Sequence, residues 1–179
     1  NEKPDIAQLE KAIHTILNRH VAFRTYFVVE EGEVVQKTID KIEEFHLSVC
    51  TLPYSDLDNI FHDFLKPFDL EKAPLIREKQ ILFDNGKALL LLDMHHIICD
   101  GTSMGIFMEE LCKLYNGEEI GNPPEIDYLD YAVWEEHYRK TTSFANSKLF
   151  WVNQFQKNIP VLDMPTTYPR GQVRSYKGE

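Results

Sequence analysis

The chain has 179 residues, of which 43% are hydrophobic and 27% are charged, a mixture typical of a globular protein with a buried core. Its formal net charge of −10 argues against nucleic acid and anionic membranes as partners, because both require a basic footprint. The three cysteines have no paired spacing, and the longest apolar run, residues 88–92, is far too short to span a membrane. We therefore expect a cytoplasmic protein with reduced thiols.

Apolar residues recur at helical spacing from Asp5 to His20, which predicts an amphipathic helix. Two β-rich runs follow over 24–29 and 34–39, and the segment 30–33 between them, Glu-Glu-Gly-Glu, is a plausible hairpin connection. A third strand is expected over 46–52. The first third of the chain therefore predicts one helix followed by short strands.

A helix is expected over 55–65, where apolar residues again fall on one face. Two strands follow over 75–83 and 87–94, with Asp-Asn-Gly as the turn between them. The second of these strands is apolar on both faces. We therefore expect it to lie at the centre of the sheet.

This second strand runs into a pair of histidines, after which a helix is expected over 102–115 with Thr102 as its N-cap. A further helix is expected over 128–140. Tyr131 and Trp134 lie on one face of it at helical spacing, so we expect them to pack in the core.

A last helix is expected over 143–157, and from Ile159 onward the chain shows no periodicity and is expected to be extended. Helices and strands alternate irregularly along the sequence. The predicted fold class is therefore α/β, a two-layer α+β sandwich.

The most informative stretch is residues 94–101, Met-His-His-Ile-Ile-Cys-Asp-Gly, where a strand passes into a helix. Successive side chains of a strand point to opposite faces, so one imidazole turns inward and the other faces the opening at the strand end. A histidine followed by a close acid and a glycine can place a base beside a reacting group. The backbone N–H of Gly101, near the helix start, can donate to a developing oxyanion, and glycine permits close approach or a positive φ.

Three other interpretations of these residues stay open. His95, His96 and Asp100 could bind a metal, although adjacent histidines rarely converge on one ion. Cys99 could be a nucleophile, although the carboxylate beside it would raise the pKa of its thiol. Both histidines could be satisfied core residues, but a strand-to-helix junction followed by Asp-Gly is a common place for a site.

The same stretch resembles the HHxxxDG signature of nonribosomal peptide synthetase condensation domains, which share their fold with chloramphenicol acetyltransferase. Further segments resemble motifs of this family in the same order along essentially the whole chain. They are an RHxxLRT-like segment at 19–25 with Phe23 in the Leu place, PFDL at 67–70, APLxR at 73–77, YxDYAxW at 128–134, Phe150-Trp151, and Leu-Asp-Met-Pro at 162–165.

The resemblance implies a role for each residue of the site. His96 would be catalytic, either as base toward an acceptor amine or by positioning that amine and stabilising the tetrahedral intermediate. His95 would be structural, and Asp100 would form an ion pair with Arg24. Gly101 would line the tunnel with its backbone N–H. The resemblance implies no metal and no cofactor bound by this chain.

A complete condensation domain has two lobes with the active site in a tunnel between them. The resemblance therefore implies that residues 1–179 are a partial domain, an incomplete N-terminal lobe of the chloramphenicol acetyltransferase-like fold. The first strand and the C-terminal lobe would be absent. Such a fragment is expected to be inactive alone.

The implied activity is an acyl transfer of secondary metabolism, namely amide-bond formation between a donor acyl or peptidyl thioester and an acceptor aminoacyl thioester. Phosphopantetheine arms would carry both on upstream and downstream peptidyl carrier domains, and an adenylation domain would belong to the same synthetase. The histidine pair argues against a heterocyclisation domain. Residues 102–105 differ from those that follow the motif in epimerisation domains, and residues 93–96 resemble those of domains that join two L-configured substrates. A coenzyme A-dependent acyltransferase of the same fold and a non-catalytic carrier-docking lobe are the alternatives.

Overall fold

The computed structural model describes residues 3–157, 159–161, 164–165 and 167–169, and it divides into two compact units at Ala132. The first unit contains α1 (Ile6–Arg19), the 3-10 turn η1 (Val21–Arg24), β1 (Thr25–Glu30), β2 (Glu33–Thr38), β3 (Ser48–Leu52), the 3-10 turn η2 (Tyr54–Asn59), α2 (Ile60–Phe64), β4 (Ile76–Phe83), β5 (Ala88–Met94) and α3 (Gly101–Tyr115). Helix α4 (Tyr128–Arg139) begins in the first unit and ends in the second, which also contains α5 (Thr142–Gln154).

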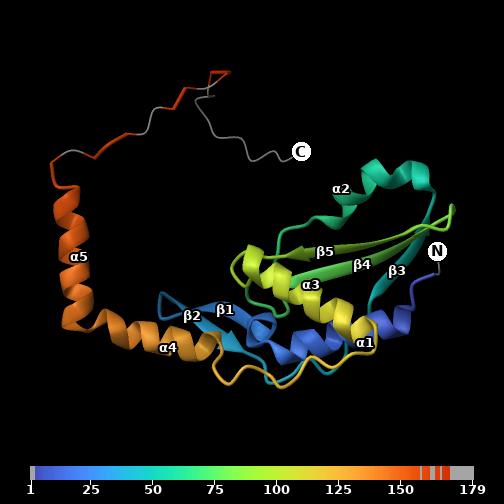
Figure 1. Ribbon diagram of the computed structural model, residues 1–179, viewed down its shortest axis with the longest axis horizontal. Coiled ribbons are helices and arrows are strands. Elements are labelled where there is room, and N and C mark those ends of the chain that lie inside the picture. Colours follow the sequence, from blue (N-terminus) through green and yellow to red (C-terminus); the bar gives the residue numbers. More distant parts are fainter. Residues whose placement is uncertain (1–2, 158, 162–163, 166, 170–179) are drawn as a thin grey trace. The chain divides into compact units, whose positions relative to one another are not determined.

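The larger sheet has the strand order β3-β4-β5, with β3 parallel and β5 antiparallel to β4 (Figure 1). The expectation that residues 87–94 form the central strand is wrong, because β4 is central and β5 lies at an edge. The apolar residues on both faces of β5 have another cause. Leu90 and Leu92 pack toward α1 and α3, whereas Leu91 and Leu89 pack toward α2. Two helical layers, rather than two neighbouring strands, account for the continuous apolar pattern.

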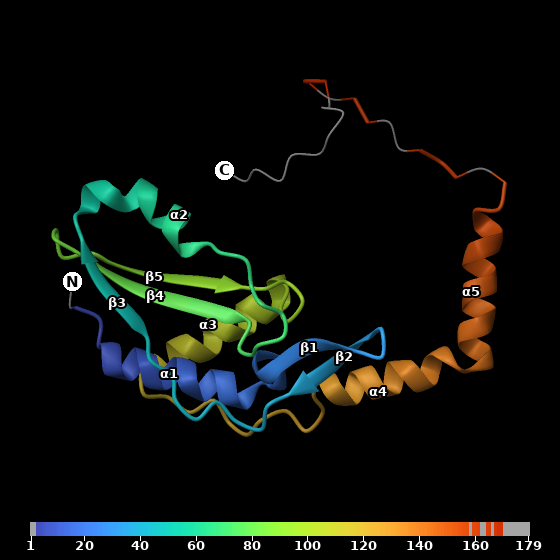
Figure 2. The ribbon, with the colours of Figure 1, turned by 180° about the vertical axis from the view of Figure 1, so that it is seen from behind.

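Helices α1 and α3 lie side by side on one face of this sheet, and α2 lies on the other (Figures 1 and 2). On the α1 side, Ile13, Ile16 and Leu17 are completely buried. These residues recur at helical spacing, so the predicted amphipathic helix is confirmed. Phe107 of α3 is 1% exposed and belongs to the same core cluster. The expected class of helices layered on a sheet is also confirmed.

The hairpin β1–β2 forms a separate two-stranded sheet. Its two turn residues, Glu31 and Gly32, have φ values of 52° and 85°, the conformation that tight hairpin turns require. The expected hairpin is therefore confirmed, with both strands displaced by one residue. The backbone N–H of Phe27 donates to the carbonyl of Leu70 at 2.8 Å, which ties β1 to the segment after α2.

Several helix boundaries differ from the expectation. The helix expected over 55–65 is a 3-10 turn followed by the short α2. Helix α3 has Asp100, and not Thr102, as its N-cap, because the Asp100 carboxylate accepts the backbone N–H of Ser103 at 2.8 Å. Helices α4 and α5 are confirmed to within a few residues.

The aromatic residues of α4 do not pack in a core within their units. Tyr131 is 49% exposed and Trp134 is 55% exposed, so the expectation of core packing is wrong. Each ring contacts a neighbour along the helix, with Tyr128 at 6.1 Å from Tyr131 and Tyr138 stacked at 5.2 Å on Trp134.

The polar residue of the 128–134 motif, Asp130, has a local structural role. Its carboxylate accepts the backbone N–H of Asp127, whose own carboxylate accepts the N–H of Leu129, a reciprocal cap at the start of α4. Part of the extended segment expected after Ile159, including residues 162–163, lies outside the described residues. None of the helices in the described ranges is both long and apolar enough to cross a membrane.

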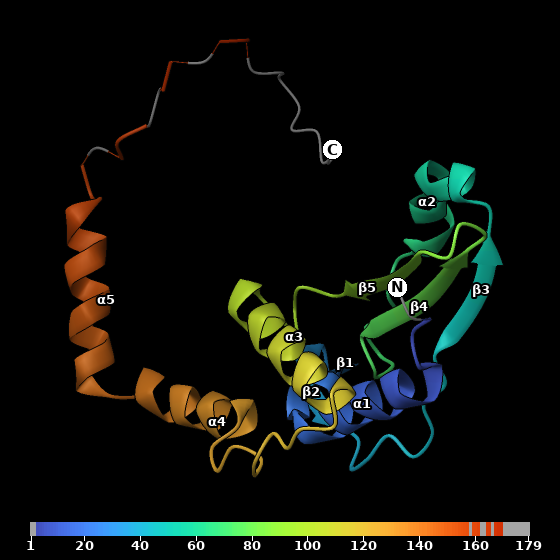
Figure 3. The same ribbon diagram turned by 45° about the vertical axis from the view of Figure 1, so that its right-hand side comes forward.

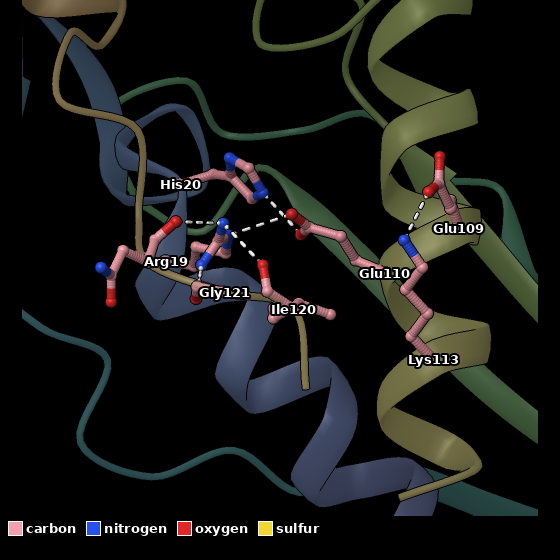
Figure 4. A network of polar contacts seen from close by, with 8 residues as sticks. Arg19, His20, Glu109, Glu110, Lys113, Ile120 and Gly121 are labelled. Carbon is pink, nitrogen blue, oxygen red and sulfur yellow. Dashed lines mark hydrogen bonds and ion pairs between the residues drawn. The ribbon is translucent and has the colours of Figure 1, made fainter. Parts of the chain in front are cut away.

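Helices α1 and α3 lie side by side (Figure 3), and a polar network joins the C-terminal end of α1 to α3 and to the loop that follows α3 (Figure 4). The Arg19 guanidinium donates to the Glu110 carboxylate at 2.9 Å and to the three carbonyls of residues 120–122 at 2.6–3.2 Å. The other carboxylate oxygen of Glu110 lies 2.7 Å from Nε2 of His20. Because Arg19 and Glu110 are 11% and 13% exposed, water does not easily replace either partner.

Removing the Glu110 carboxylate tests this network. Glu110→Ala leaves Arg19 and His20 without their shared carboxylate, and we expect the free energy of unfolding to fall by about 3 kcal/mol. Glu109→Ala is the matched control, because the neighbouring Glu109 is exposed and, among the described residues, pairs with Lys113 alone. It should be nearly neutral, as measured by urea unfolding. Equal losses in both variants would contradict the structural role of Glu110.

Glu78, in the central strand β4, gives the fold a pH dependence. Burial raises the pKa of Glu78 from its ordinary value of 4.5 to about 7. Because the folded state holds this proton more tightly than the unfolded chain, stability falls as the pH rises from about 4.5 to about 7. Glu78→Gln should therefore be more stable than the wild type at pH 8 by about 1–2 kcal/mol, a value reduced for the partial exposure of the side chain. Unfolding curves at pH 4 should coincide, and coincidence at pH 8 as well would contradict the assignment.

Candidate active site at the end of β5

The histidine segment begins where the β4–β5 ladder ends. The backbone N–H of His95 donates to the carbonyl of Leu75 at 3.0 Å, which extends the pairing one residue beyond Met94. The carbonyl of His95 then accepts the N–H of Ile98 at 3.1 Å, so the chain turns tightly into α3. Residues 95–100 are thus a short connection fixed at both ends.

The His95 ring is half-buried and held on two sides. Its Nδ1 accepts the backbone N–H of Ile97 at 3.0 Å, and its ring meets Phe68 edge-on at 5.9 Å. The guanidinium of Arg77 lies 3.8 Å from the Phe68 ring centre and pairs with Asp93 at 3.2 Å. Three segments of the family motifs therefore meet at His95, a convergence that sequence spacing did not reveal.

His96 is exposed, and its ring forms no hydrogen bond with any residue of the described ranges. It lies between two pockets, of about 370 Å³ and about 600 Å³. Residues of η1, the hairpin, the 96–100 loop, α3 and the start of α4 line the first pocket: Ala22, Thr25, Phe27, Gln36, His96, Ile97, Ile98, Cys99, Asp100, Ser103 and Tyr128. The segments 65–70 and 93–96 line the second. His96 is the residue common to both linings.

The hairpin wall of the first pocket was missed by sequence reasoning. Thr25 and Phe27 of β1 lie on one face, and Gln36 of β2 is the register partner of Phe27. The alternation of side chains predicts which residues of each strand share a face. The pocket wall can be identified only when the register of the two strands is also known.

Asp100 and Arg24 do not form the expected ion pair; within the described part of the chain, no salt bridge joins them. The Asp100 carboxylate instead accepts both the N–H and the hydroxyl of Ser103, each at 2.8 Å. Nη1 of Arg24 donates to the carbonyls of Ile39 and Asp40 at 2.7 and 2.8 Å. Asp100 is therefore paired within the first turn of α3, and Arg24 bonds across the base of the hairpin.

Gly101 is the first residue of α3, and its φ lies outside the left-handed region. A Cβ built at this position would meet no atom within 4 Å. Neither a positive φ nor a close approach within this chain explains the glycine. Its backbone N–H at the positive end of α3 remains the relevant feature.

The other expected chemistries have little support. The Cys99 thiol donates to the His95 carbonyl at 3.6 Å, and burial together with the Asp100 charge raises the pKa of this thiol. A thiol with a raised pKa is a poor nucleophile. Within the described ranges, no group of three or more His, Cys, Asp or Glu residues is arranged to hold a metal ion.

The cap formed by Asp100 gives a second pH-dependent prediction. The Ser103 N–H and hydroxyl lower the pKa of Asp100, and the charge of His96 lowers it further. This contribution to stability is present above the ordinary pKa of 3.8 and is lost as the pH falls through the lower folded-state pKa. Asp100→Ala should lower Tm at pH 7, whereas Asp100→Asn should not, because Asn is a cap of similar strength. In strong acid the wild type and Asp100→Ala should converge; an equal loss in the Asn variant would point to a charge partner instead.

Comparison with known proteins places the chain in a family. The Condensation domain family matches residues 1–179. Bacitracin synthase 3 of Bacillus licheniformis is 41% identical, over 98% of this chain and 3% of that protein. Surfactin synthase subunit 2 of Bacillus subtilis (strain 168) is 39% identical, over 98% of this chain and 5% of that protein.

The fold has solved counterparts. The first condensation domain of the calcium-dependent antibiotic synthetase, solved in complex with a substrate analogue, matches with a TM-score of 0.69 and 22% identity. The match covers 88% of this chain and 40% of that domain, so the chain spans less than half of the solved domain and a few per cent of the synthases. The fold class and the motif resemblance are both confirmed. The chain belongs to the condensation domain family of nonribosomal peptide synthetases.

Proposed function

We propose that this chain contributes His96 and one wall of a site that joins a donor acyl or peptidyl thioester to the amine of an acceptor aminoacyl thioester. The observation that carries this proposal is the place of His96 between two pockets. An amide-forming reaction brings two substrates to one point, and a residue that borders both approaches can act on the pair.

The reaction forms a bond between the acceptor nitrogen and the thioester carbonyl carbon, and it breaks the carbon–sulfur bond. The proton leaves the nitrogen and reaches the departing thiolate. A neutral imidazole at His96 can take or position that proton near pH 7. The N–H of Gly101, at the N-terminus of α3, can donate to the oxyanion of the tetrahedral intermediate.

The supporting residues have revised roles in this proposal. His95 holds the loop through Ile97 and Phe68. Asp100 begins α3 and so fixes where the loop ends, while Arg24 fixes the base of the hairpin that lines the first pocket.

The substrates would arrive on phosphopantetheine arms of upstream and downstream peptidyl carrier domains, with an adenylation domain in the same synthetase. Condensation domains with this fold are longer than this chain, which covers 40% of the solved one. We therefore expect the isolated 179 residues to be inactive in condensation.

His96→Ala in the complete condensation domain tests the proposal. We expect the condensation rate, measured between two loaded carrier proteins, to fall by about 10²–10⁴-fold while carrier binding is retained. His95→Asn is the matched control, because the Asn oxygen can replace Nδ1 as acceptor of the Ile97 N–H. It should retain most of the rate.

Unchanged turnover in His96→Ala would contradict the proposal and leave a docking role for this chain. Transfer from coenzyme A to a free amine, with none between carrier proteins, would indicate the other acyltransferase class.

A further inference from the structure

The carboxamide of Gln36 has no hydrogen-bond partner among the residues that the structure describes. Its Nε2 is buried, and the side chain forms no hydrogen bond with any described residue. Among the described residues, one other buried side-chain atom, Nε of Arg24, shares this condition. A buried unpaired polar group destabilises a fold, so native proteins contain few of them, and those they contain often lie at functional sites.

Gln36 lies in the wall of the pocket that His96 borders. It stands opposite Phe27 in the register of the hairpin, and both side chains line this pocket. The next residue, Lys37, points to the other face of the hairpin, where it pairs with Glu30. The position of Gln36 in the strand therefore directs its carboxamide toward the pocket.

Two hydroxyl groups in the lining of this pocket, those of Thr25 and Ser103, are already committed. The Thr25 hydroxyl donates to the carbonyl of Val21 at 2.9 Å, and the Ser103 hydroxyl donates to Asp100 at 2.8 Å. Gln36 thus offers a donor and an acceptor that no neighbour uses. A carboxamide pairs well with another amide, because its N–H donates to the carbonyl while its oxygen accepts the N–H.

We propose that Gln36 is a substrate-binding residue whose carboxamide hydrogen-bonds an amide of the substrate in the first pocket, holding the reacting carbon beside His96. This inference rests on the proposed function. The amide could belong to the amino-acid part of the substrate or to the pantetheine arm, since both carry the same group. Two probes separate these sources.

Two substitutions in the complete condensation domain test the role. Gln36→Met keeps the length and removes hydrogen bonding, and Gln36→Glu keeps the acceptor but removes the donor. Lys37→Met is the control, because it replaces a polar side chain by the same apolar one at the next position, on the opposite face of the strand. Since Gln36→Met removes an unpaired buried group, its Tm should equal or exceed that of the wild type. A lowered Tm would reveal a structural partner and overturn the proposal.

Binding is measured with an N-acetyl-aminoacyl methyl thioester, which lacks the arm, and with pantetheine, which lacks the amino acid. We expect Kd for one of the two probes to rise by about tenfold in both Gln36 variants and to stay unchanged in Lys37→Met. The probe that loses affinity identifies the amide. Unchanged Kd for both probes would overturn the proposal.

The wild-type condensation rate is measured on the same preparation. Absent condensation together with Gln36-dependent probe binding would refute the proposed function and keep Gln36 as a binding residue. Normal condensation together with unchanged probe affinity in the Gln36 variants would refute the present inference alone. In turnover, the Gln36 variants should raise KM more than they lower kcat.

Discussion

The packing of α3 on α1 fixes where the histidine loop of the site ends. Phe107 and Leu111 of α3 share one buried cluster with Ile13 and Leu17 of α1, and this cluster holds the helix in place. The N-terminus of α3 therefore stands at a set distance from the end of β5. The loop between them has little freedom, and His96 projects from it into solvent between two hollows of the surface. The Arg19–Glu110 pair reinforces the same contact at its polar rim.

Hydrophobic periodicity predicted the elements well because burial against one partner layer leaves a clear pattern. Helix α1, the hairpin and the β4–β5 pair all follow it. The same pattern could not distinguish a strand with two strand neighbours from one covered by helices on both faces, which is why β5 was misplaced. Periodicity also could not show that Tyr131 and Trp134 would stay exposed, because a helix with an apolar stripe does not specify what covers it.

For the site, sequence similarity located the loop but not its contacts. Arg24 and Asp100 carry opposite charges and belong to two motifs, yet Asp100 bonds to Ser103, three residues away, and Nη1 of Arg24 bonds to the carbonyls of Ile39 and Asp40. For Asp100, the N–H and hydroxyl of Ser103 cost little entropy to reach, so this local cap outcompetes a distant ion pair. Gln36 belongs to none of the family motifs, and only the hairpin register places it in the pocket that the histidine loop lines. Several motif residues serve one another, as Arg77 and Phe68 do when they orient His95.

The single hydrogen bond from the Phe27 N–H to the Leu70 carbonyl has a mechanical consequence. Phe27 belongs to the wall of one pocket and Leu70 to the wall of the other. The walls of the two hollows are therefore connected twice, by this hydrogen bond and by His96, which lines both. A molecule that displaces the hairpin also strains the segment facing the second hollow. The shapes of the two hollows are therefore not independent, because one backbone bond joins the wall of the first to the wall of the second.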